Sequence, residues 1–535
     1  MTWEKTVPVS ELAGRPRVFK RPPRQVALFL VGERVFAVDN RCPHEGYPLA
    51  EGKVDGACVL TCNWHNWKFR LEDGECLLGG DHVRSYAAKV EDGHVWVEFA
   101  DPPAEATLRR TLDGLRKAFD ERDFGRVCRE VSRLHFHGLD PLAAVRRAVE
   151  WSYDRLEFGY THAYAAAADW LALARAFAGD WEKQLICLAE AVDHMAFDAL
   201  RGRAYPYAPP GPPFTRQAFL DAVEGERGAE AEGLVRRAVA DGLHWPDLEE
   251  AFVAAALAHY NDFGHSLIFV CKNAQLLALL GPESEPSLLP ALARHLCYTT
   301  REDLIPEFRS YAEALAGLDP PAARDGGALD SGELFPASTR DALSWVARHI
   351  GDHRPQTLYD ALLEALARNL LHFDVRYERA FDRPVTQNVG WLDFTHGVTF
   401  ANAARVVCGR YPQYWGAALQ QMACFVGRNR PYLDLGIDVS AWRVSDPDAF
   451  FAAAHERILD HGIRDPIFSA HLIKPTAAVA EELPHASPSC RAALLAGLNR
   501  YLQSPPKQQH VRRLARQAIA LVQRDFAAGH GEQPA

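Results

Sequence analysis

The sequence lacks the features that mark several protein classes. No run of 18 apolar residues occurs among its 535 residues, so it predicts no membrane-spanning helix. Its polar start, MTWEKTVPVSELAG, is unlike a signal peptide. The net charge of -11 argues against a general nucleic-acid-binding protein. The 11 scattered cysteines fit a reducing cytosol better than a disulfide scaffold. We therefore expect a cytoplasmic protein that binds neither membranes nor nucleic acid.

The length and the patterning predict a multidomain chain with a β-rich first part. A chain of 535 residues is long enough for two or more domains. The stretch QVALFLVGERVFAVD has two apolar runs around a Gly-Glu pair, which is typical of a hairpin. Residues 58–80 and 90–99 repeat this pattern, each with an Asp-Gly turn. We expect a small all-β domain over residues 1–104.

Two cysteine–histidine pairs lie in this β-rich part. Cys42 and His44 form the first pair and Cys62 and His65 the second, with 17 residues between His44 and Cys62. Thiolate and imidazole pairs can bind zinc, but zinc sites usually space the two members of a pair more widely than Cys-x-His. Cys-Pro-His followed by Cys-x-x-His, with the downstream WHNWKFRLEDGE, resembles the Rieske iron–sulfur signature.

The Rieske resemblance implies a 2Fe–2S cluster. It assigns Cys42 and Cys62 to one iron and His44 and His65 to the other. Respiratory Rieske proteins add a disulfide that braces the two loops, whereas this chain has Tyr47 and Trp64 in the corresponding places. The resemblance therefore implies a low-potential cluster, near the bottom of the roughly −150 to +300 mV Rieske range, that donates electrons for oxygen activation.

The chain from residue 105 to 535 is predicted to be a large all-α domain. Segments such as ATLRRTLDGLRKAFDERDF and DALLEALARNLLHFD have helical periodicity, and the two prolines in ADPPAEA mark the join near residues 100–106. The usual Rieske oxygenase catalytic domain is α+β and carries a second histidine five residues after the first. Here Asp393-x-x-His396 is followed by Ala401, and His259 and His265 are six apart. That partner domain is therefore expected to be absent.

Four histidines stand out because they lie in apolar helical surroundings. Each alone is more often a hydrogen-bonded core residue, but buried imidazoles need partners. An aromatic-Thr-His triplet precedes two similar segments, and without a gap Trp181 aligns with Trp415, which suggests an internal duplication. Two halves that each give two histidines to one centre would form a four-helix metal cage. The four are His162, His265, His396 and His471.

A second resemblance covers roughly residues 141–482. LDFTHGVTFANA, GHSLIFVCKNAQ and HLIKPTAAVAEE resemble the histidine segments of the questin-oxidase-like family, whose members are largely helical oxygenases. The type member opens an anthraquinone ring. The resemblance implies a mononuclear non-haem Fe(II) centre held by the four histidines, with the lysine of the His-x-x-Lys motif at Lys474.

The role of Lys474 stays open at the level of sequence. A charged ammonium has no lone pair for a metal, so Lys474 would donate to a substrate or, once carbamylated by carbon dioxide, bind the metal as a carboxylate. A surface or ion-paired lysine is the plain alternative. Pro475 disfavours helical geometry at Lys474 and is expected to open a helix there.

Two aspartates each precede a centre histidine by three residues. Asp262 precedes His265 and Asp393 precedes His396, and on a helix this spacing puts both residues on one face. Each aspartate either orients its histidine or caps a helix start.

These parts predict a Rieske-dependent oxygenase. The cluster takes electrons from an external reductase or ferredoxin and feeds a mononuclear iron, which activates dioxygen to oxidise an organic substrate. The family suggests an aromatic or quinone-like polyketide as that substrate. Two alternatives remain at this level: an electron-transfer protein whose helical domain only docks a partner, and a diiron oxygenase, although diiron sites are usually rich in carboxylates.

Overall fold

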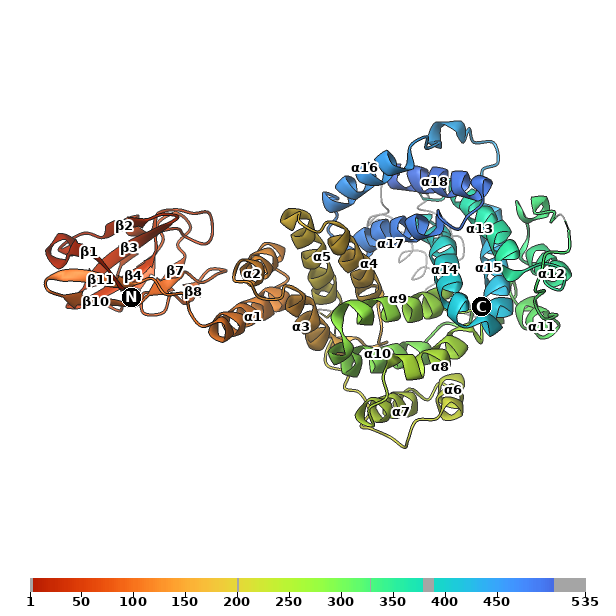
Figure 1. Ribbon diagram of the computed structural model, residues 1–535, viewed down its shortest axis with the longest axis horizontal. Helices are drawn as coiled ribbons and strands as arrows, with labels where there is room; N and C mark the ends of the chain where they lie inside the picture. The colour runs from red at the N-terminus through yellow and green to blue at the C-terminus, as the bar shows by residue number, and fades with distance from the viewer. Residues whose placement is uncertain (1–2, 200–201, 328, 379–388, 505–535) are drawn as a thin grey trace, which may run out of the picture. The chain divides into compact units, whose positions relative to one another are not determined.

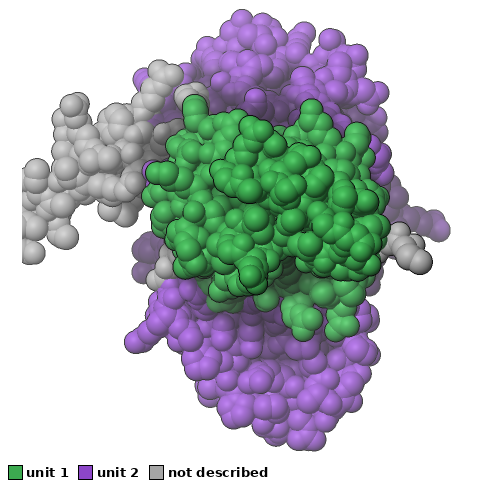
Figure 2. Space-filling view, turned by 90° about the vertical axis from the view of Figure 1, so that its left-hand side faces the viewer, with its two compact units in different colours: residues 1–141 green, residues 142–535 purple. Residues whose placement is uncertain are grey.

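The computed structural model describes residues 3–199, 202–327, 329–378 and 389–504 (Figure 1). The chain forms two compact units, residues 1–141 and 142–535, which Figure 2 shows in different colours. Strands occur in the first unit and helices fill the second, so the predicted order of a small β domain and a large helical domain is confirmed.

Three antiparallel sheets form the β part of the first unit. One has the order β1-β11-β10, the second β2-β3-β4-β9 and the third β5-β6-β7-β8. The predicted hairpin is present, because Val31 pairs with Arg34 across the Gly-Glu turn. Their bounds are β1 Trp3–Pro8, β2 Arg17–Arg21, β3 Arg24–Val31, β4 Arg34–Asp39, β5 Lys53–Val54, β6 Val59–Thr61, β7 Lys68–Arg70, β8 Cys76–Leu78, β9 Ser85–Tyr86, β10 Ala88–Glu91 and β11 His94–Glu98.

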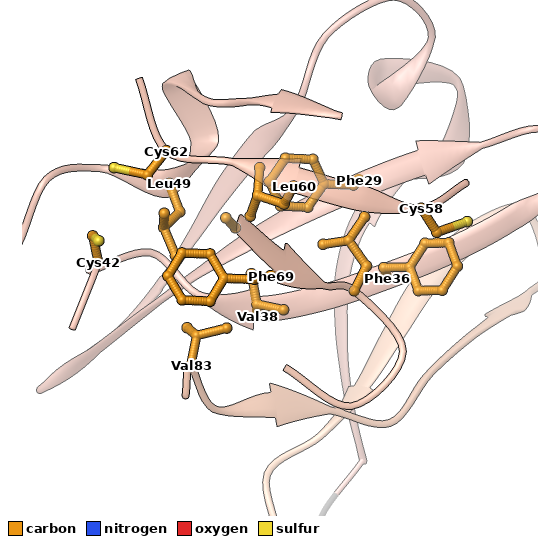
Figure 3. Packing of buried hydrophobic residues seen from close by; sticks show 12 residues of the cluster. Phe29, Phe36, Val38, Cys42, Leu49, Cys58, Leu60, Cys62, Phe69 and Val83 are labelled. Carbon is orange, nitrogen blue, oxygen red and sulfur yellow. The ribbon is translucent and has the colours of Figure 1, made fainter. Parts of the chain in front are cut away.

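The core of the β part connects the sheets to the predicted cluster loops. Phe29 and Phe36 from the second sheet and Leu60 and Phe69 from the third pack into one buried group. Figure 3 shows Cys42 and Cys62 at one end of this group. The two loops that carry these cysteines are therefore anchored in a packed core.

Two helices belong to the first unit. Helix α1 (Ala104–Glu121) starts shortly after β11, where the prolines predicted a join, and α2 (Phe124–Phe136) follows it. The buried Asp81 carboxylate accepts hydrogen bonds from Arg129 (3.0 Å) and Arg133 (2.6 Å) of α2. The predicted division at residues 104/105 falls at the start of α1, whereas the compact unit continues to Pro141.

The second unit consists of helices joined by loops. Its helices are α3 Leu142–Ser152, α4 His162–Ala176, α5 Trp181–Ala199, α6 Arg216–Glu224, α7 Gly228–Ala240, α8 Trp245–Leu257, α9 His265–Leu280, α10 Glu285–Cys297, α11 Ser310–Ala316, α12 Thr339–His349, α13 Pro355–Leu371, α14 Trp391–Arg410, α15 Trp415–Asn429, α16 Pro447–Leu459, α17 Pro466–Glu482 and α18 Pro488–Gln503. One segment, Asp262–Leu280, is long and apolar enough to cross a membrane, but 67% of it is buried inside the structure, and core helices pass the same test.

Four helices form a closed ring at the centre of the second unit. Helix α4 packs on α9, α9 on α14, α14 on α17 and α17 on α4 (Figure 1). Helix α5 packs on α4 and α15 on α14, and α5 and α15 begin at the two tryptophans that align in the sequence, Trp181 and Trp415. The ring is the arrangement that the predicted four-helix cage requires.

We predict that α1 and α2 stabilise the β part through Asp81. A fragment of residues 1–104 is expected to fold but to be less stable than residues 1–141, because it loses both arginine partners of this carboxylate. The partly exposed arginines limit the difference in unfolding free energy to about 2 kcal/mol. Chemical denaturation of both fragments measures it.

The matched control is Asp81→Asn in residues 1–141, which removes the charge but keeps both helices. This variant should lose most of the stability by which residues 1–141 exceed residues 1–104. Equal stability of the two unmodified fragments would contradict the prediction.

Candidate metal centres

The two predicted cluster loops share one backbone design. In the first loop Gly46 N donates to Cys42 O (2.8 Å), and in the second Asn66 N donates to Cys62 O (3.0 Å). Gly46 and Asn66 both have left-handed φ angles, 78° and 62°, which glycine and asparagine tolerate better than other residues. Each loop is therefore a tight turn that brings its histidine back beside its cysteine.

The two loop histidines direct their Nδ1 atoms toward each other. The Nδ1 atoms of His44 and His65 are 2.9 Å apart, and the ring planes are nearly perpendicular. Two nitrogens that each lie about 2.0–2.1 Å from one metal ion at a right angle are separated by about 3 Å. The pair thus has the spacing of two ligands on one ion. Trp67 stacks on His44 at 4.7 Å between centroids and supports its ring.

The two loop cysteines are buried behind the histidines. Cys42 and Cys62 lie at the same end of the β core, whereas Cys58 lies at the other (Figure 3). Burial raises the pKa of the Cys42 thiol to about 11. A thiolate in this position therefore needs a positive partner, and the iron of a cluster would supply one.

Aromatic stacking joins the two loops where respiratory Rieske proteins have a disulfide. Tyr47 and Trp64 stack with centroids 5.8 Å apart. Trp64 is 60% exposed and donates its indole N–H to Glu45 (3.2 Å). The Tyr47 hydroxyl donates to Glu51 (3.0 Å). The loops are thus held together by contacts that do not depend on cysteine oxidation.

Comparison with known proteins identifies this part of the chain. Residues 2–87 match the family model of the Rieske [2Fe-2S] domain. A 3-phenylpropionate/cinnamic acid dioxygenase ferredoxin subunit from Photorhabdus laumondii is 31% identical over 78 residues, which are 14% of this chain and 74% of the relative. The chain belongs to the Rieske family. The Rieske domain in turn implies a 2Fe–2S cluster.

Other similar proteins match about a fifth of this chain. A 4beta-methylsterol monooxygenase from Methylococcus capsulatus is 36% identical over 126 residues, or 20% of this chain. The chain spans about a third (34%) of that relative's length. The ferredoxin of carbazole 1,9a-dioxygenase from Nocardioides aromaticivorans is 24% identical, with a TM-score of 0.18, and the match covers 18% of this chain and 98% of the ferredoxin.

The four predicted histidines of the helical unit lie close together: ring nitrogens of His162, His265 and His396 are all within 4.8 Å of one another, and His471 adjoins His396. His265 Nε2 lies 3.0 Å from His162 Nε2 and 3.0 Å from His396 Nε2, and His471 Nε2 lies 3.4 Å from His396 Nε2. One histidine comes from each helix of the central ring: α4, α9, α14 and α17. The structure thus brings together all four residues that the sequence singled out.

The outer nitrogens of two centre histidines fix the state of the inner ones. His471 Nδ1 donates to the Ile467 carbonyl at 2.6 Å, so its Nε2 carries a lone pair. His265 Nδ1 lies 3.5 Å from Asp262, which likewise leaves a lone pair on the inner nitrogen. His265 Nε2 cannot accept well from both of its close Nε2 neighbours. Several nitrogen lone pairs therefore point into the centre, and there are too few N–H groups to donate a hydrogen bond to each.

A metal ion fits this arrangement better than protons do. Burial holds the pKa of His162, His396 and His471 well below the ordinary value, so these imidazoles stay neutral. Separations of 3.0–3.4 Å between the inner nitrogens are close to those of imidazoles that share one ion. Neutral histidine nitrogens are common ligands of iron and other transition metals.

Lys474 lies beside the histidines in a buried place. It is 1% exposed, and its Nζ has no hydrogen-bond partner among the residues that the structure describes. Its Nζ lies 5.7 Å from the centroid of the Phe269 ring. Burial lowers the pKa of Lys474 to about 7, so a neutral amine is accessible near neutral pH. The surface-lysine alternative is wrong.

The expectation that Pro475 opens a helix at Lys474 is also wrong. Helix α17 begins at Pro466 and continues through Pro475, so His471 and Lys474 share one helix. A proline at this position cannot donate to the carbonyl of His471 four residues earlier. The Tyr501 hydroxyl of α18 donates to that carbonyl instead, at 2.8 Å. Tertiary contact thus replaces the hydrogen bond that the proline removes.

The two aspartates have different roles. Asp262 contacts His265 and also lies 3.3 Å from His295 Nε2. Asp393 accepts from Gly390 N at 2.8 Å and caps the start of α14. Although the two aspartates have the same spacing in the sequence, Asp262 orients a histidine and Asp393 caps a helix.

A buried ion pair near the centre was missed from the sequence. Lys272 donates to Asp169 at 2.7 Å, and both side chains are almost completely buried. Each lies seven residues after a centre histidine, His265 or His162, and two helical turns keep a residue on the same face. That spacing was the available signal. The pair puts a fixed charge of each sign behind the histidines.

We predict that Cys42, His44, Cys62 and His65 hold the cluster. Purified protein should be brown and show a Rieske-type resonance when reduced, and Cys62→Ser should lose both because one iron loses a thiolate. Cys58→Ser is the matched control and should keep the cluster, since this buried cysteine lies at the other end of the core. Electron paramagnetic resonance with iron and sulfide analysis measures the outcome. Zinc without sulfide in anaerobically isolated protein would exclude the assignment.

Proposed function

We propose that this protein is a Rieske-dependent non-haem iron oxygenase. The observation that carries the proposal is the convergence of four inner imidazole nitrogens in a chain that also has a Rieske domain. The resemblance to the questin-oxidase-like family supports an organic substrate of the aromatic or quinone-like polyketide class. The two named relatives from oxygenase systems support a role in oxygen chemistry.

The residues divide the work between two centres. Cys42, His44, Cys62 and His65 would hold the 2Fe–2S cluster, and His162, His265, His396 and His471 a mononuclear Fe(II). When bound, such an iron supplies dioxygen activation with electrons that the cluster delivers singly. The protein's own part is to fix the imidazoles. Ile467 and Asp262 orient two of them, and the packed ring of helices surrounds all four.

An external reductase or ferredoxin is the proposed electron donor. His44 and His65 are exposed, so the histidine side of the cluster is open to a protein partner. A cleft of about 1000 Å³ opens beside Cys42 and His44. Its lining includes five arginines and the acidic residues Asp39, Glu45, Asp81 and Glu130, so it offers both signs of charge to a protein partner. The cleft's arginines are Arg24, Arg41, Arg84, Arg110 and Arg133.

Lys474 would complete the helical centre as a carbamate. Four neutral imidazoles leave the two charges of Fe(II) uncompensated, and an anionic ligand would balance part of them. A neutral Lys474 amine can attack carbon dioxide, form an N–C bond and release one proton to solvent, which leaves a carboxylate-like anion. Its burial and its pKa of about 7 favour the neutral amine that this reaction needs.

We predict about three iron ions per chain, two in the cluster and one in the helical centre. His396→Ala and His471→Ala should each lose about one iron and keep the Rieske resonance, because the cluster ligands belong to the other unit. Metal analysis with electron paramagnetic resonance measures both quantities.

His349→Ala is the matched control, since His349 lies on α12 outside the central ring. It should keep all of the iron. About two irons in the unmodified protein would favour an electron-transfer role, and about four a diiron oxygenase. If the single histidine mutants kept all of the iron and full turnover, the histidines would not be metal ligands.

We predict that Lys474→Ala weakens iron binding because the anionic ligand is lost. Added bicarbonate should raise the iron affinity of the unmodified protein and leave the mutant unchanged. Titration with Fe(II) under anaerobic conditions, with and without bicarbonate, measures the affinities. Lys183→Ala is the control, because Lys183 is half-buried on α5, pairs with Glu456 and is not one of the proposed ligands; it should respond like the unmodified protein. An equal response of Lys474→Ala would contradict carbamylation.

A further inference from the structure

The residues just before α9 form a left-handed turn. Asp262, Phe263 and Gly264 have φ angles of 45°, 51° and 78° in succession. Only glycine adopts this conformation at little cost, and single left-handed residues are the rule elsewhere. A run of three, with phenylalanine in the middle, is strained. Such strain persists only where the surroundings hold it, and it concentrates at functional sites.

Contacts on several sides hold the turn in place. Asp262 N donates to Thr300 O and Phe263 N donates to the Glu302 carboxylate, both at 3.0 Å. Arg428 donates to the other oxygen of Glu302 at 2.6 Å and lies over the Phe263 ring at 3.9 Å from its centroid. One arginine thus fixes both the backbone and the side chain of Phe263.

Gly264 presses the turn against the helix core. A Cβ atom there would lie 2.7 Å from the Phe400 ring and 3.0 Å from the Phe425 ring. Neither distance leaves room for a side chain. The start of α9, and with it His265, therefore has a fixed position relative to these two rings.

The turn sends two neighbouring side chains to two different histidines of the centre. The Asp262 carboxylate lies 3.5 Å from His265 Nδ1. The Phe263 ring lies 6.1 Å from the His396 ring between centroids. A right-handed turn would direct the Asp262 and Phe263 side chains differently. Their contacts with His265 and His396 therefore depend on the strained left-handed geometry.

The centre is more open on the side of this turn. His396 and His471 are 7% and 3% exposed, whereas the His265 side chain is 12% exposed and His162 is not fully buried. Phe263 is half-buried. A molecule that reaches the centre from solvent would therefore approach along His162, His265 and the Phe263 ring.

We propose that Phe263 is the specificity-determining wall of this approach and favours an electron-rich aromatic substrate. This deepens the proposed function and rests on it. The Arg428 cation lies over the Phe263 ring and withdraws electron density from it. A ring with that partner stacks best on an electron-rich aromatic, such as a phenol. Asp262 acts as a positioning residue for His265 from the same turn.

The first test compares phenol with cyclohexanol as probes of similar size. Full-length protein carries Co(II) in place of the helical iron, and the cobalt difference spectrum reports the dissociation constant of each probe. The unmodified protein should bind phenol about 3- to 10-fold more tightly than cyclohexanol. Phe263→Leu should remove this preference, because it removes the ring and keeps an apolar side chain.

Phe308→Leu is the matched control. Phe308 also lies beneath Arg428, at 5.9 Å, but it is buried in the core. It should keep the preference for phenol. Persistence of the preference in Phe263→Leu, or no preference in the unmodified protein, would overturn the inference. Failure to bind cobalt would instead count against the proposed metal centre, so the two failures are distinguishable.

The second test needs no metal and examines the turn itself. Phe263→Gly and Phe263→Ala both lack the ring, but only glycine adopts a left-handed φ without strain. Phe263→Gly should therefore melt about 1–2 °C above Phe263→Ala in thermal unfolding. The opposite order would show that the left-handed backbone at this position carries no strain that glycine relieves, and would overturn the proposal.

Discussion

Four imidazole nitrogens that face one another in a buried place are the constraint on which the helical unit depends. His265 and His471 use their outer N–H groups elsewhere, so their inner lone pairs point at the other two rings. Burial keeps the remaining rings neutral. Without a cation, this centre would be a set of poorly satisfied polar groups in an apolar interior, which is costly.

The surrounding structure is organised to hold these rings. Each ring helix supplies one histidine, and each packs on two others of the ring. Contacts behind the rings do the finer work: Asp262 reaches His265 through a strained turn, and the Tyr501 hydroxyl occupies the carbonyl that Pro475 leaves without a donor. These contacts limit the movement of the histidines and keep their nitrogens directed at one point.

The Rieske domain solves a similar problem with a different structure. Two short loops with matching hydrogen bonds place His44 and His65 at the surface and Cys42 and Cys62 in the core. The buried thiols would make a bound cluster part of the domain's packing, and the exposed imidazoles would leave it accessible to a protein partner. In the proposed function, the exposed histidines of the Rieske domain would receive electrons, and the buried histidines of the helical unit would hold the reacting metal.

The sequence by itself determined the classes of structure and the residues of interest. Short spacing in Cys-Pro-His and Cys-x-x-His identified the Rieske loops, because local spacing limits which side chains can meet within a turn. Helical periodicity predicted the all-α second unit, and apolar surroundings selected four histidines out of 22.

Only the tertiary structure decided the features that depend on contacts between distant parts of the chain. The ring of α4, α9, α14 and α17 brings together residues as far apart as His162 and His471, and Tyr501 lets α17 pass through Pro475. Glu302 and Arg428 hold a left-handed turn that no local propensity predicts, and Asp262 and Asp393 have the same spacing but different partners. Local rules could not reach these features, because each depends on a partner supplied by another helix or loop.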